Sequence, residues 1–242
     1  MFFKIIIRQF IKNLRRLRIL LYRRAYISSR REKDIVRLFT KLYYDSYYFG
    51  KTWNTTSWLG IPVHKNPFDL WVYQEIIFKK RPDIIIEAGT ARGGSAFFFA
   101  TLCDLVGNGS VITIDTKVKN ENRPKHRRIS YLLGSSTDEA VVRKIKSLIG
   151  NSEKVMVVLD SRHHKWHVLN ELKIYSQIVT PGQYLVVEDS CLNDHPVHHG
   201  FGPGPMEAID EFIAGSKNFK IDREQEKHLM TFNPKGYLLK IK

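Results

Sequence analysis

Two apolar segments of the chain end in acidic residues that could together hold a metal ion. Residues 155–160 end in Asp160, and residues 184–189 end in Glu188 and Asp189. If both segments are neighbouring parallel strands, their carboxyl ends lie side by side, about 4.8 Å apart per strand, and the three carboxylates converge. Like charges this close repel unless a cation bridges them, and an all-oxygen set favours Mg²⁺ or another hard divalent ion. We therefore predict a Mg²⁺ site at these three residues, the alternative being that each acid only caps a helix.

A glycine-rich turn follows another apolar segment. Residues 83–95 read DIIIEAGTARGGS, in which the isoleucines suit a strand buried on both faces. In an open α/β sheet, a nucleotide-like ligand binds at the carboxyl end of such a strand, against the N-terminus of the next helix, which Ser95 is expected to cap. The motif E-x-G-T-x-x-G-G-S is not the dinucleotide fingerprint and looks like the first motif of class I S-adenosylmethionine-dependent methyltransferases, although a glycine pair can also form only a tight turn. The residues expected to bind the cofactor here are Glu87, Gly89, Thr90, Arg92, Gly93, Gly94 and Ser95.

Polar residues at the ends of the next two expected strands extend this cofactor site. Asp115 follows Gly93 by 22 residues and can accept hydrogen bonds from both ribose hydroxyls of an adenosyl group. In the segment GSSTD at 134–138, we expect Ser135, Ser136 and Asp138 to contact the adenine side. Capping of the following helices is the alternative, because Asp and Ser are preferred N-cap residues.

The histidine-rich stretch after Asp160 supplies candidate groups for proton transfer. Methyl transfer from a sulfonium to oxygen needs a nucleophilic oxygen about 3 Å from the methyl carbon and a base that removes its proton. Our catalytic candidates are His163, Lys165 and His167, with His163 as the base because it lies nearest the expected metal ligand; the alternative is a surface histidine. Residues 193–205 hold three histidines and three glycines, and they form either a lid over the substrate or a plain connection.

From Pro82 onward, strand-like and helix-like segments alternate. This pattern predicts an α/β fold with a doubly wound, mostly parallel, Rossmann-like sheet. The last two expected strands, 228–232 and 237–241, flank Asn-Pro-Lys-Gly and should form an antiparallel hairpin. The other expected strands are 83–88, 111–115, 129–133, 155–160 and 184–189, and the expected helices are 67–79, 96–106, 138–149, 165–178 and 205–213.

Much of the net charge of +15 lies in an N-terminal arm. Residues 1–31 contain ten lysines and arginines and no acidic residue. Apolar residues recur at steps of four and three, so one face of a helix is apolar and its flanks are basic; they are Phe3, Ile7, Phe10, Leu14, Leu17 and Leu21. We predict an amphipathic helix that holds a cytoplasmic protein peripherally on the inner face of an anionic membrane. The alternatives are a nucleic-acid patch, a transit peptide, or a helix that packs on a partner or on the domain itself.

Three regions are expected along the 242 residues: the basic arm 1–31, a helical and loop extension 32–80 that covers the substrate side, and the α/β domain 81–242. Trp53 and Trp58 lie among turn residues and either stack on a substrate or cover the core.

Cys103 and Cys191 lack metal-type spacing and fit a reducing compartment. The sequence has no uncharged apolar run of about 18 residues, so we predict no transmembrane helix. No segment outside the arm interleaves basic and aromatic residues as a nucleic-acid groove does. A homo-oligomer is compatible with the sequence.

Several long motifs occur in one order along the chain. They are residues 81–95, Val158-Leu159-Asp160-Ser161 with His163 and His167, Val187-Glu188-Asp189, Gly-Pro-Gly-Pro at 202–205 and Asn-Pro-Lys-Gly-Tyr at 233–237. Together they resemble the cephalosporin hydroxylase / rhamnosyl O-methyltransferase family. The resemblance implies a class I methyltransferase fold, S-adenosylmethionine as cofactor, Mg²⁺ at the three acids, and a hydroxyl of a sugar, polysaccharide or glycolipid as acceptor. Arg162 and His164 depart from the family pattern on the substrate side, and the residues that match its cofactor-binding stretches are Glu87, Gly89, Arg92, Gly93 and Asp115.

Two other classes of function are alternatives to a methyltransferase. A hydroxylase or other oxidoreductase with non-haem iron would need a His-x-Asp/Glu pair, and none of the nine histidines has an acid two residues on. A nicotinamide enzyme would need the missing dinucleotide fingerprint. A non-catalytic, membrane-associated binding protein with this fold would not need Asp115 and the three acids. We therefore expect a Mg²⁺-assisted, S-adenosylmethionine-dependent O-methyltransferase.

Overall fold

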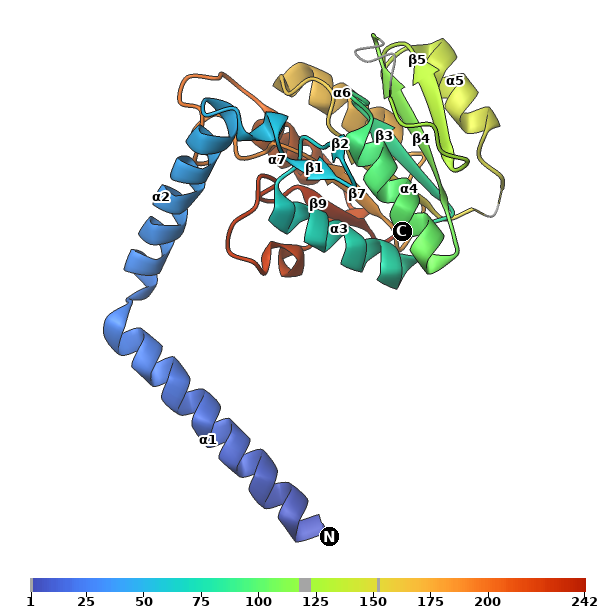
Figure 1. The fold of residues 1–242 in the computed structure, drawn as a ribbon. Coiled ribbons are helices and arrows are strands. Elements are labelled where there is room, and N and C mark those ends of the chain that lie inside the picture. The colour runs from blue at the N-terminus through green and yellow to red at the C-terminus, as the bar shows by residue number, and fades with distance from the viewer. Residues whose placement is uncertain (1, 118–122, 152) are drawn as a thin grey trace.

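A seven-stranded sheet with helices on both faces forms the main body, and the first helix of the chain extends away from it (Figure 1). The computed structural model describes residues 2–117, 123–151 and 153–242. Before the sheet come α1 (Phe2–Tyr26), α2 (Ser29–Tyr48), the 3-10 helix η1 (Thr52–Asn54), β1 (Ser57–Trp58), β2 (Ile61–Pro62) and α3 (Pro67–Lys80). The remaining elements are β3 (Ile84–Ala88), α4 (Gly94–Val106), β4 (Ser110–Asp115), β5 (Ile129–Leu133), α5 (Glu139–Ser147), β6 (Val155–Leu159), α6 (Lys165–Tyr175), β7 (Tyr184–Val187), α7 (Pro205–Gly215), β8 (Phe219–Ile221), η2 (Arg223–Glu226) and β9 (Tyr237–Lys240).

The strands of the large sheet follow the order β5-β4-β3-β6-β7-β9-β8. Strands β3 to β7 are parallel, and Ile86 of β3 pairs with Ile112 of β4 on one side and Val157 of β6 on the other. The chain runs outward from β3 through β4 and β5, then returns to place β6 against the free side of β3. This reversal opens a crevice at the carboxyl ends of the strands, where ligands bind in folds of this kind. The expected doubly wound, mostly parallel sheet is confirmed.

Alternate residues of the central strands enter two separate cores. Ile84 and Ile86 pack with α5, α6 and α7, whereas Ile85 packs with α3 and α4. Successive side chains of a strand point to opposite faces, so a strand covered on both sides must be apolar throughout. All residues of β3, β6 and β7 are buried, which accounts for their apolar runs, interrupted only by Glu87 of β3. The two cores thereby fix where each strand ends and where the acids that follow it stand.

Helix α4 begins at a glycine cap. Gly93 is its N-cap, with a φ of 82°, a left-handed conformation that glycine adopts readily. The expected cap at Ser95 was wrong, because this residue lies inside the first turn. Burial raises the pKa of Glu87, and the Ser95 side chain is one of the groups that oppose this rise.

The C-terminal antiparallel pair is present, but one of its strands differs from the expected one. Strand β9 lies between β7 and β8 and runs antiparallel to both. Residues 228–232 form no strand, and β8 takes their expected place beside β9. The 228–232 segment is instead held by Asp69 of α3, which accepts hydrogen bonds from the Thr231 hydroxyl (2.5 Å) and the Phe232 backbone N–H (2.9 Å). The buried carboxylate of Asp69 thus takes the place of a pairing strand. The hydrophobic pattern of residues 228–232 gives no sign of this contact.

The N-terminal arm is helical, and α1 extends away from the sheet (Figure 1). Its described apolar side chains are exposed, including Phe10 (63%) and Leu21 (59%). The alternative in which this helix packs on its own domain was therefore wrong for those side chains. Among the residues that the structure describes, no helix combines the length and the apolar character needed to cross a bilayer. Five residues expected on the apolar face or its basic flanks lie in this helix, but their side chains fall outside what the structure describes: Phe3, Lys4, Arg8, Arg23 and Arg24.

The segment between α2 and α3 contains the small antiparallel pair β1–β2 rather than a plain loop. Trp58 of β1 packs against the Phe98 ring at 4.9 Å and donates a hydrogen bond to Thr101 Oγ1 at 2.9 Å. Of the two alternatives for these tryptophans, Trp58 therefore covers the core. Trp53 lines the cavity described next.

Candidate active site

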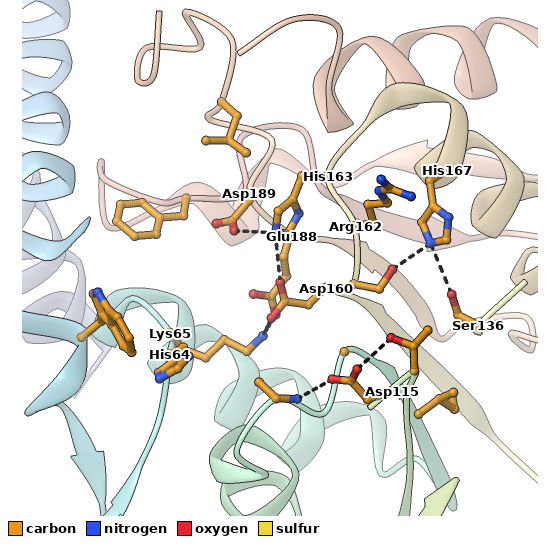
Figure 2. Close-up of a pocket in the computed structure, with 18 of the residues that line it drawn as sticks. His64, Lys65, Asp115, Ser136, Asp160, Arg162, His163, His167, Glu188 and Asp189 are labelled. Atoms are coloured by element: carbon orange, nitrogen blue, oxygen red, sulfur yellow. Dashed lines mark hydrogen bonds and ion pairs between the residues drawn. The ribbon is translucent and has the colours of Figure 1, made fainter. Parts of the chain in front are cut away.

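A cavity of about 790 Å³ lies at the carboxyl edge of the parallel strands. The turns after β3, β4, β5, β6 and β7 bound it, together with the end of α2 and the loop around His198 (Figure 2). The sheet topology thus brings distant parts of the chain to one opening. Nine of the residues expected from the sequence to form the site line this cavity: Gly89, Asp115, Ser135, Ser136, Asp160, His163, His167, Glu188 and Asp189.

Asp115 ends β4 and is held by the glycine-rich turn. Its Oδ2 accepts a hydrogen bond from the backbone N–H of Ala91 at 2.9 Å, and its Oδ1 accepts one from that of Lys117 at 3.2 Å. Oδ1 also accepts a long hydrogen bond from the Thr116 hydroxyl at 3.5 Å, which a stronger donor can displace, and Oδ2 keeps a lone pair for a further donor. The oriented carboxylate can therefore accept hydrogen bonds from a diol.

Gly89 sets how closely the ends of β3 and β6 approach each other. A Cβ at this position would lie 1.9 Å from the carbonyl oxygen of Asp160, and the φ of Gly89 is 108°. Only glycine fits this conformation and this contact.

The other residues of the glycine-rich turn support it from outside the cavity lining. Buried Glu87 accepts a hydrogen bond from Thr113 Oγ1 at 2.6 Å, and Thr90 Oγ1 lies 2.7 Å from the same hydroxyl. The Arg92 guanidinium lies 5.5 Å from the centre of the Trp53 ring. These contacts hold the turn against β4 and the segment before α3. Six residues expected to bind the cofactor are absent from the lining: Glu87, Thr90, Arg92, Gly93, Gly94 and Ser95.

Asp138 and Lys165 are also directed away from the cavity. The carboxylate of Asp138 caps α5 by accepting hydrogen bonds from the backbone N–H groups of Ala140 (2.8 Å) and Val141 (3.1 Å), so the capping alternative holds. Lys165 forms an ion pair with Glu211 of α7 at 2.8 Å. That contact ties α6 to α7 and leaves Lys165 outside the lining, contrary to its expected catalytic place.

A buried lysine joins the acidic residues. Lys65 Nζ forms ion pairs with Asp160 and, at 2.7 Å, with Glu188 Oε1, and only 3% of Lys65 is exposed. Tyr73 of α3 donates a hydrogen bond to the same Glu188 oxygen at 2.7 Å. Our sequence reasoning missed Lys65, because a lone lysine before Pro67 forms no pattern.

His163 lies on the other side of Asp160 from Lys65 (Figure 2). Its Nε2 is 3.3 Å from Asp189 Oδ2 and 3.9 Å from Asp160 Oδ1. Asp189 has a φ of 55°, a conformation that is uncommon outside glycine and that clusters at functional sites.

Burial and charge act on this cluster in opposite directions. Burial raises the pKa of Glu188 and of Asp189, while Lys65 opposes the rise at Glu188 and His163 opposes it at Asp189. Burial alone would lower the pKa of Lys65, but Asp160 and Glu188 outweigh it and hold this pKa above its ordinary value. If all three carboxylates ionise together, pairing with the Lys65 ammonium still leaves two negative charges. A divalent cation would neutralise them.

The geometry of the cluster suits such a cation. Asp160, His163 and Asp189 each offer one ligand atom, and these atoms lie within 4.8 Å of one another. Of the three expected metal ligands, Asp160 and Asp189 belong to this group, whereas Glu188 is engaged by Lys65 and Tyr73. Two carboxylates with one imidazole also differ from the two histidines and one carboxylate of iron oxygenases.

His167 belongs to a separate network in the cavity wall. Its Nε2 lies 3.0 Å from Ser161 Oγ and 3.4 Å from Ser136 Oγ. Both hydroxyls donate to Glu171 Oε1, at 2.7 and 2.5 Å. The network ties the turn after β5 to α6, so His167 positions the wall next to Ser136.

The model of the family described as Rhamnosyl O-methyltransferase/CmcI matches residues 50–241. The chain belongs to this family. The rhamnosyl O-methyltransferase of Mycobacterium tuberculosis (strain ATCC 25618 / H37Rv) is 40% identical over 205 residues, which cover 82% of this chain and 83% of the relative. That of Mycobacterium leprae (strain TN) is 37% identical over 204 residues, which cover 81% and 89%.

Solved structures of CmcI show the same fold. An apo structure has a TM-score of 0.63 and 20% identity and covers 78% of this chain and 77% of its own. A structure of CmcI with Mg and S-adenosylmethionine has a TM-score of 0.61 and 20% identity and covers 78% of each chain. Membership of the Rhamnosyl O-methyltransferase/CmcI family confirms the resemblance seen in the motifs and the enzyme class, an S-adenosylmethionine-dependent methyltransferase.

Proposed function

We propose that the protein transfers a methyl group from S-adenosylmethionine to a sugar hydroxyl, with Mg²⁺ assisting. A rhamnosyl residue of a glycolipid or polysaccharide is the first candidate acceptor, because the curated relatives are named rhamnosyl O-methyltransferases. The observation that carries the proposal is that Asp115 and the acidic cluster of Asp160, Glu188 and Asp189 line one cavity. A ribose-binding acid next to a divalent-cation site is what metal-assisted methyl transfer to oxygen requires.

Residues of the turns after β3, β4 and β5 would bind the cofactor. Asp115 would accept hydrogen bonds from the ribose hydroxyls, since its carboxylate is already oriented by two backbone donors. Ser135 and Ser136 would contact the adenine side, and Gly89 leaves the backbone open to close approach. The cofactor supplies an electrophilic methyl group. Glu87 and Thr90 act behind the turn by holding it to Thr113.

The acidic cluster would hold the metal and handle the proton. Asp160 and Asp189 would bind Mg²⁺, with Glu188 beside them and His163 within reach of the same position. A bound divalent ion lowers the pKa of an acceptor hydroxyl and orients it. His163 Nε2 would take the hydroxyl proton, because Asp189 Oδ2, at 3.3 Å, stabilises the imidazolium that results.

Calorimetric titration with S-adenosylmethionine tests the cofactor site. We expect Asp115→Asn to weaken binding about 10- to 100-fold, because charge-assisted hydrogen bonds are worth about 1.5–3 kcal/mol. Asp138→Asn is the matched control: asparagine caps a helix about as well as aspartate, so the affinity should stay within about twofold. Equal affinities in Asp115→Asn and the wild type would argue against this site.

Transfer of labelled methyl to methyl α-L-rhamnopyranoside tests the reaction. We expect product in the presence of Mg²⁺, a rate that falls when EDTA removes the ion, and recovery when Mg²⁺ is restored in excess. If the protein binds S-adenosylmethionine but methylates no rhamnoside, the sugar acceptor is wrong. An EDTA-insensitive rate would contradict the metal.

We also propose that α1 attaches the protein to an anionic membrane surface. Its described apolar side chains are exposed, among them Phe10, Leu14 and Leu17, and Lys12 and Arg15 lie next to them in the sequence. A helix of this kind gains free energy when its apolar face enters the interface and its basic residues meet anionic lipid. The attachment would hold the cavity close to membrane-bound sugar acceptors.

Co-sedimentation with vesicles tests this attachment. The full chain should bind phosphatidylserine-rich vesicles more strongly than phosphatidylcholine vesicles, and added salt should weaken the binding. Replacing Leu14 and Leu17 by serine should reduce binding at least about 10-fold, because each leucine loses its apolar burial. Leu42→Ser, an exposed position of α2, is the matched control and should bind as the wild type does. Equal binding of all three proteins would contradict the attachment.

A further inference from the structure

The end of α2 closes one side of the cavity. Tyr44, Tyr47 and Tyr48 line it, although α2 precedes the residues 50–241 that the family model matches. In Figure 2 this helix stands at the left, on the opposite side of Asp160 from Asp115 and Ser136. The two ends of the cavity therefore differ: one carries the groups proposed for the cofactor, and α2 forms the other.

Aromatic rings cover the α2 end of the cavity. Tyr44 and Tyr48 stack with 5.6 Å between ring centroids and 7° between ring planes. His198 lies 6.4 Å from the first ring and 6.2 Å from the second, and its Nδ1 is 3.4 Å from the Tyr44 hydroxyl. Phe201 extends this surface, 5.3 Å from His198. We refer to Tyr44, Tyr48, His198 and Phe201 as the aromatic wall; Tyr48 is 51% exposed, so the wall is open to an incoming ligand.

Tyr47 adds an unpartnered hydroxyl between the aromatic wall and the acids. Its side chain lines the cavity, only 9% of the residue is exposed, and its hydroxyl has no hydrogen-bond partner among the described residues. Asp189, Lys65 and Asp160 all act on it electrostatically, so it lies near the acidic cluster. Buried hydroxyls almost always have a partner, and an exception calls for a ligand, water or ion that supplies one.

These features match the chemistry of a pyranose ring. A sugar presents C–H groups on its faces, which pack on aromatic rings, and hydroxyl groups around its edge, which need donors and acceptors. An aromatic surface beside an unpartnered hydroxyl offers both kinds of contact. A nucleotide is a poorer match for this end, because the aromatic wall carries no lysine or arginine to meet a phosphate.

We propose that the aromatic wall and Tyr47 form the acceptor subsite, an inference that rests on the proposed function. The aromatic wall packs on a C–H face of the sugar, and the Tyr47 hydroxyl hydrogen bonds with a ring hydroxyl next to the one that is methylated. Helix α2 then decides which sugar is accepted, from outside the part of the chain that the family model matches.

Steady-state kinetics of Tyr47→Phe with methyl α-L-rhamnopyranoside test the subsite. We expect KM for the rhamnoside to rise at least about 10-fold, because a site that pairs a substrate hydroxyl loses that pairing. The Kd for S-adenosylmethionine should stay within about twofold. The Tm should stay equal or rise, because the variant no longer buries an unpartnered hydroxyl. Tyr43→Phe is the matched control: its ring stacks on Tyr47 at 6.3 Å, it is absent from the lining, and its KM should not change.

Tyr48→Ala tests the aromatic wall at a position where the core is not disturbed, since this side chain is half exposed. It should also raise KM for the rhamnoside and leave Kd for S-adenosylmethionine unchanged. Unchanged KM in both Tyr47→Phe and Tyr48→Ala would overturn the subsite while leaving the methyltransferase function intact. A lower Tm with unchanged KM in Tyr47→Phe would assign Tyr47 to packing and overturn it as well. If the wild type neither binds nor methylates the rhamnoside, the proposed sugar acceptor fails and the subsite falls with it.

Discussion

Asp160→Asn is expected to reduce methyl transfer and divalent-cation affinity, each by at least about 100-fold. Mutating a residue that only contacts a metal ligand typically lowers metal affinity or activity about 10- to 100-fold, and losing a ligand itself should cost at least as much. Asparagine keeps the shape of the side chain but removes its charge. Asp160 forms an ion pair with Lys65, and it is also one of the three candidate metal ligands, together with His163 and Asp189. Mn²⁺ binding followed by electron paramagnetic resonance measures the affinity, and labelled methyl transfer measures the rate.

Two comparisons make this result specific. Asp34→Asn changes an exposed carboxylate of α2 and should leave Mn²⁺ binding and the rate unchanged. The affinity of Asp160→Asn for S-adenosylmethionine should stay within about threefold, since Asp115 rather than Asp160 is proposed to hold the ribose. An Asp160→Asn protein that binds Mn²⁺ as tightly as the wild type would exclude Asp160 as a ligand.

Lys65→Met is expected to lower the free energy of unfolding by about 3–5 kcal/mol when EDTA is present. Methionine keeps the apolar stem and approximate length of lysine, but it leaves Asp160 and Glu188 facing each other without their ammonium group. Removing one partner of a buried ion pair is costly because the remaining charge is neither hydrated nor paired. Urea unfolding at fixed protein concentration measures the effect.

Added Mg²⁺ should recover part of this loss, and it should stabilise Lys65→Met more than it stabilises the wild type. A divalent ion that binds only the folded state compensates the charge that lysine no longer balances. Lys144→Met, on the exposed face of α5, is the control and should change neither the stability nor its dependence on Mg²⁺. If Lys65→Met unfolds at the wild-type urea concentration, Lys65 does not balance the acidic cluster.

The main elements of the fold could be predicted because their signals are local. Strands β6 and β7 are continuous apolar runs and β3 is apolar except for Glu87, which is the pattern of strands buried on both faces. The acids that follow β6 and β7 could be placed together because the ends of parallel strands share one edge of the sheet. The expected cap at Ser95 failed because a glycine in a left-handed conformation can start a helix without any side-chain cap.

The C-terminal strands show where local pattern is insufficient. Residues 228–232 resemble a strand, yet they are held by side-chain hydrogen bonds from Asp69, far away in the sequence. The short β8 segment has little pattern of its own and pairs because β9 presents a free edge to it.

The sequence by itself determined the five parallel strands and the helices between them, the edge at which Asp115, Asp160, Glu188 and Asp189 gather, and the basic amphipathic character of residues 1–31. These follow from periodicity, burial and strand polarity, which act over a few neighbouring residues. Only the tertiary structure decided that Lys65 balances Asp160 and Glu188, that Glu87 and Asp138 stand outside the cavity, and that Tyr47 of α2 reaches it. Those outcomes depend on charge compensation and packing between segments that meet only after the chain has folded.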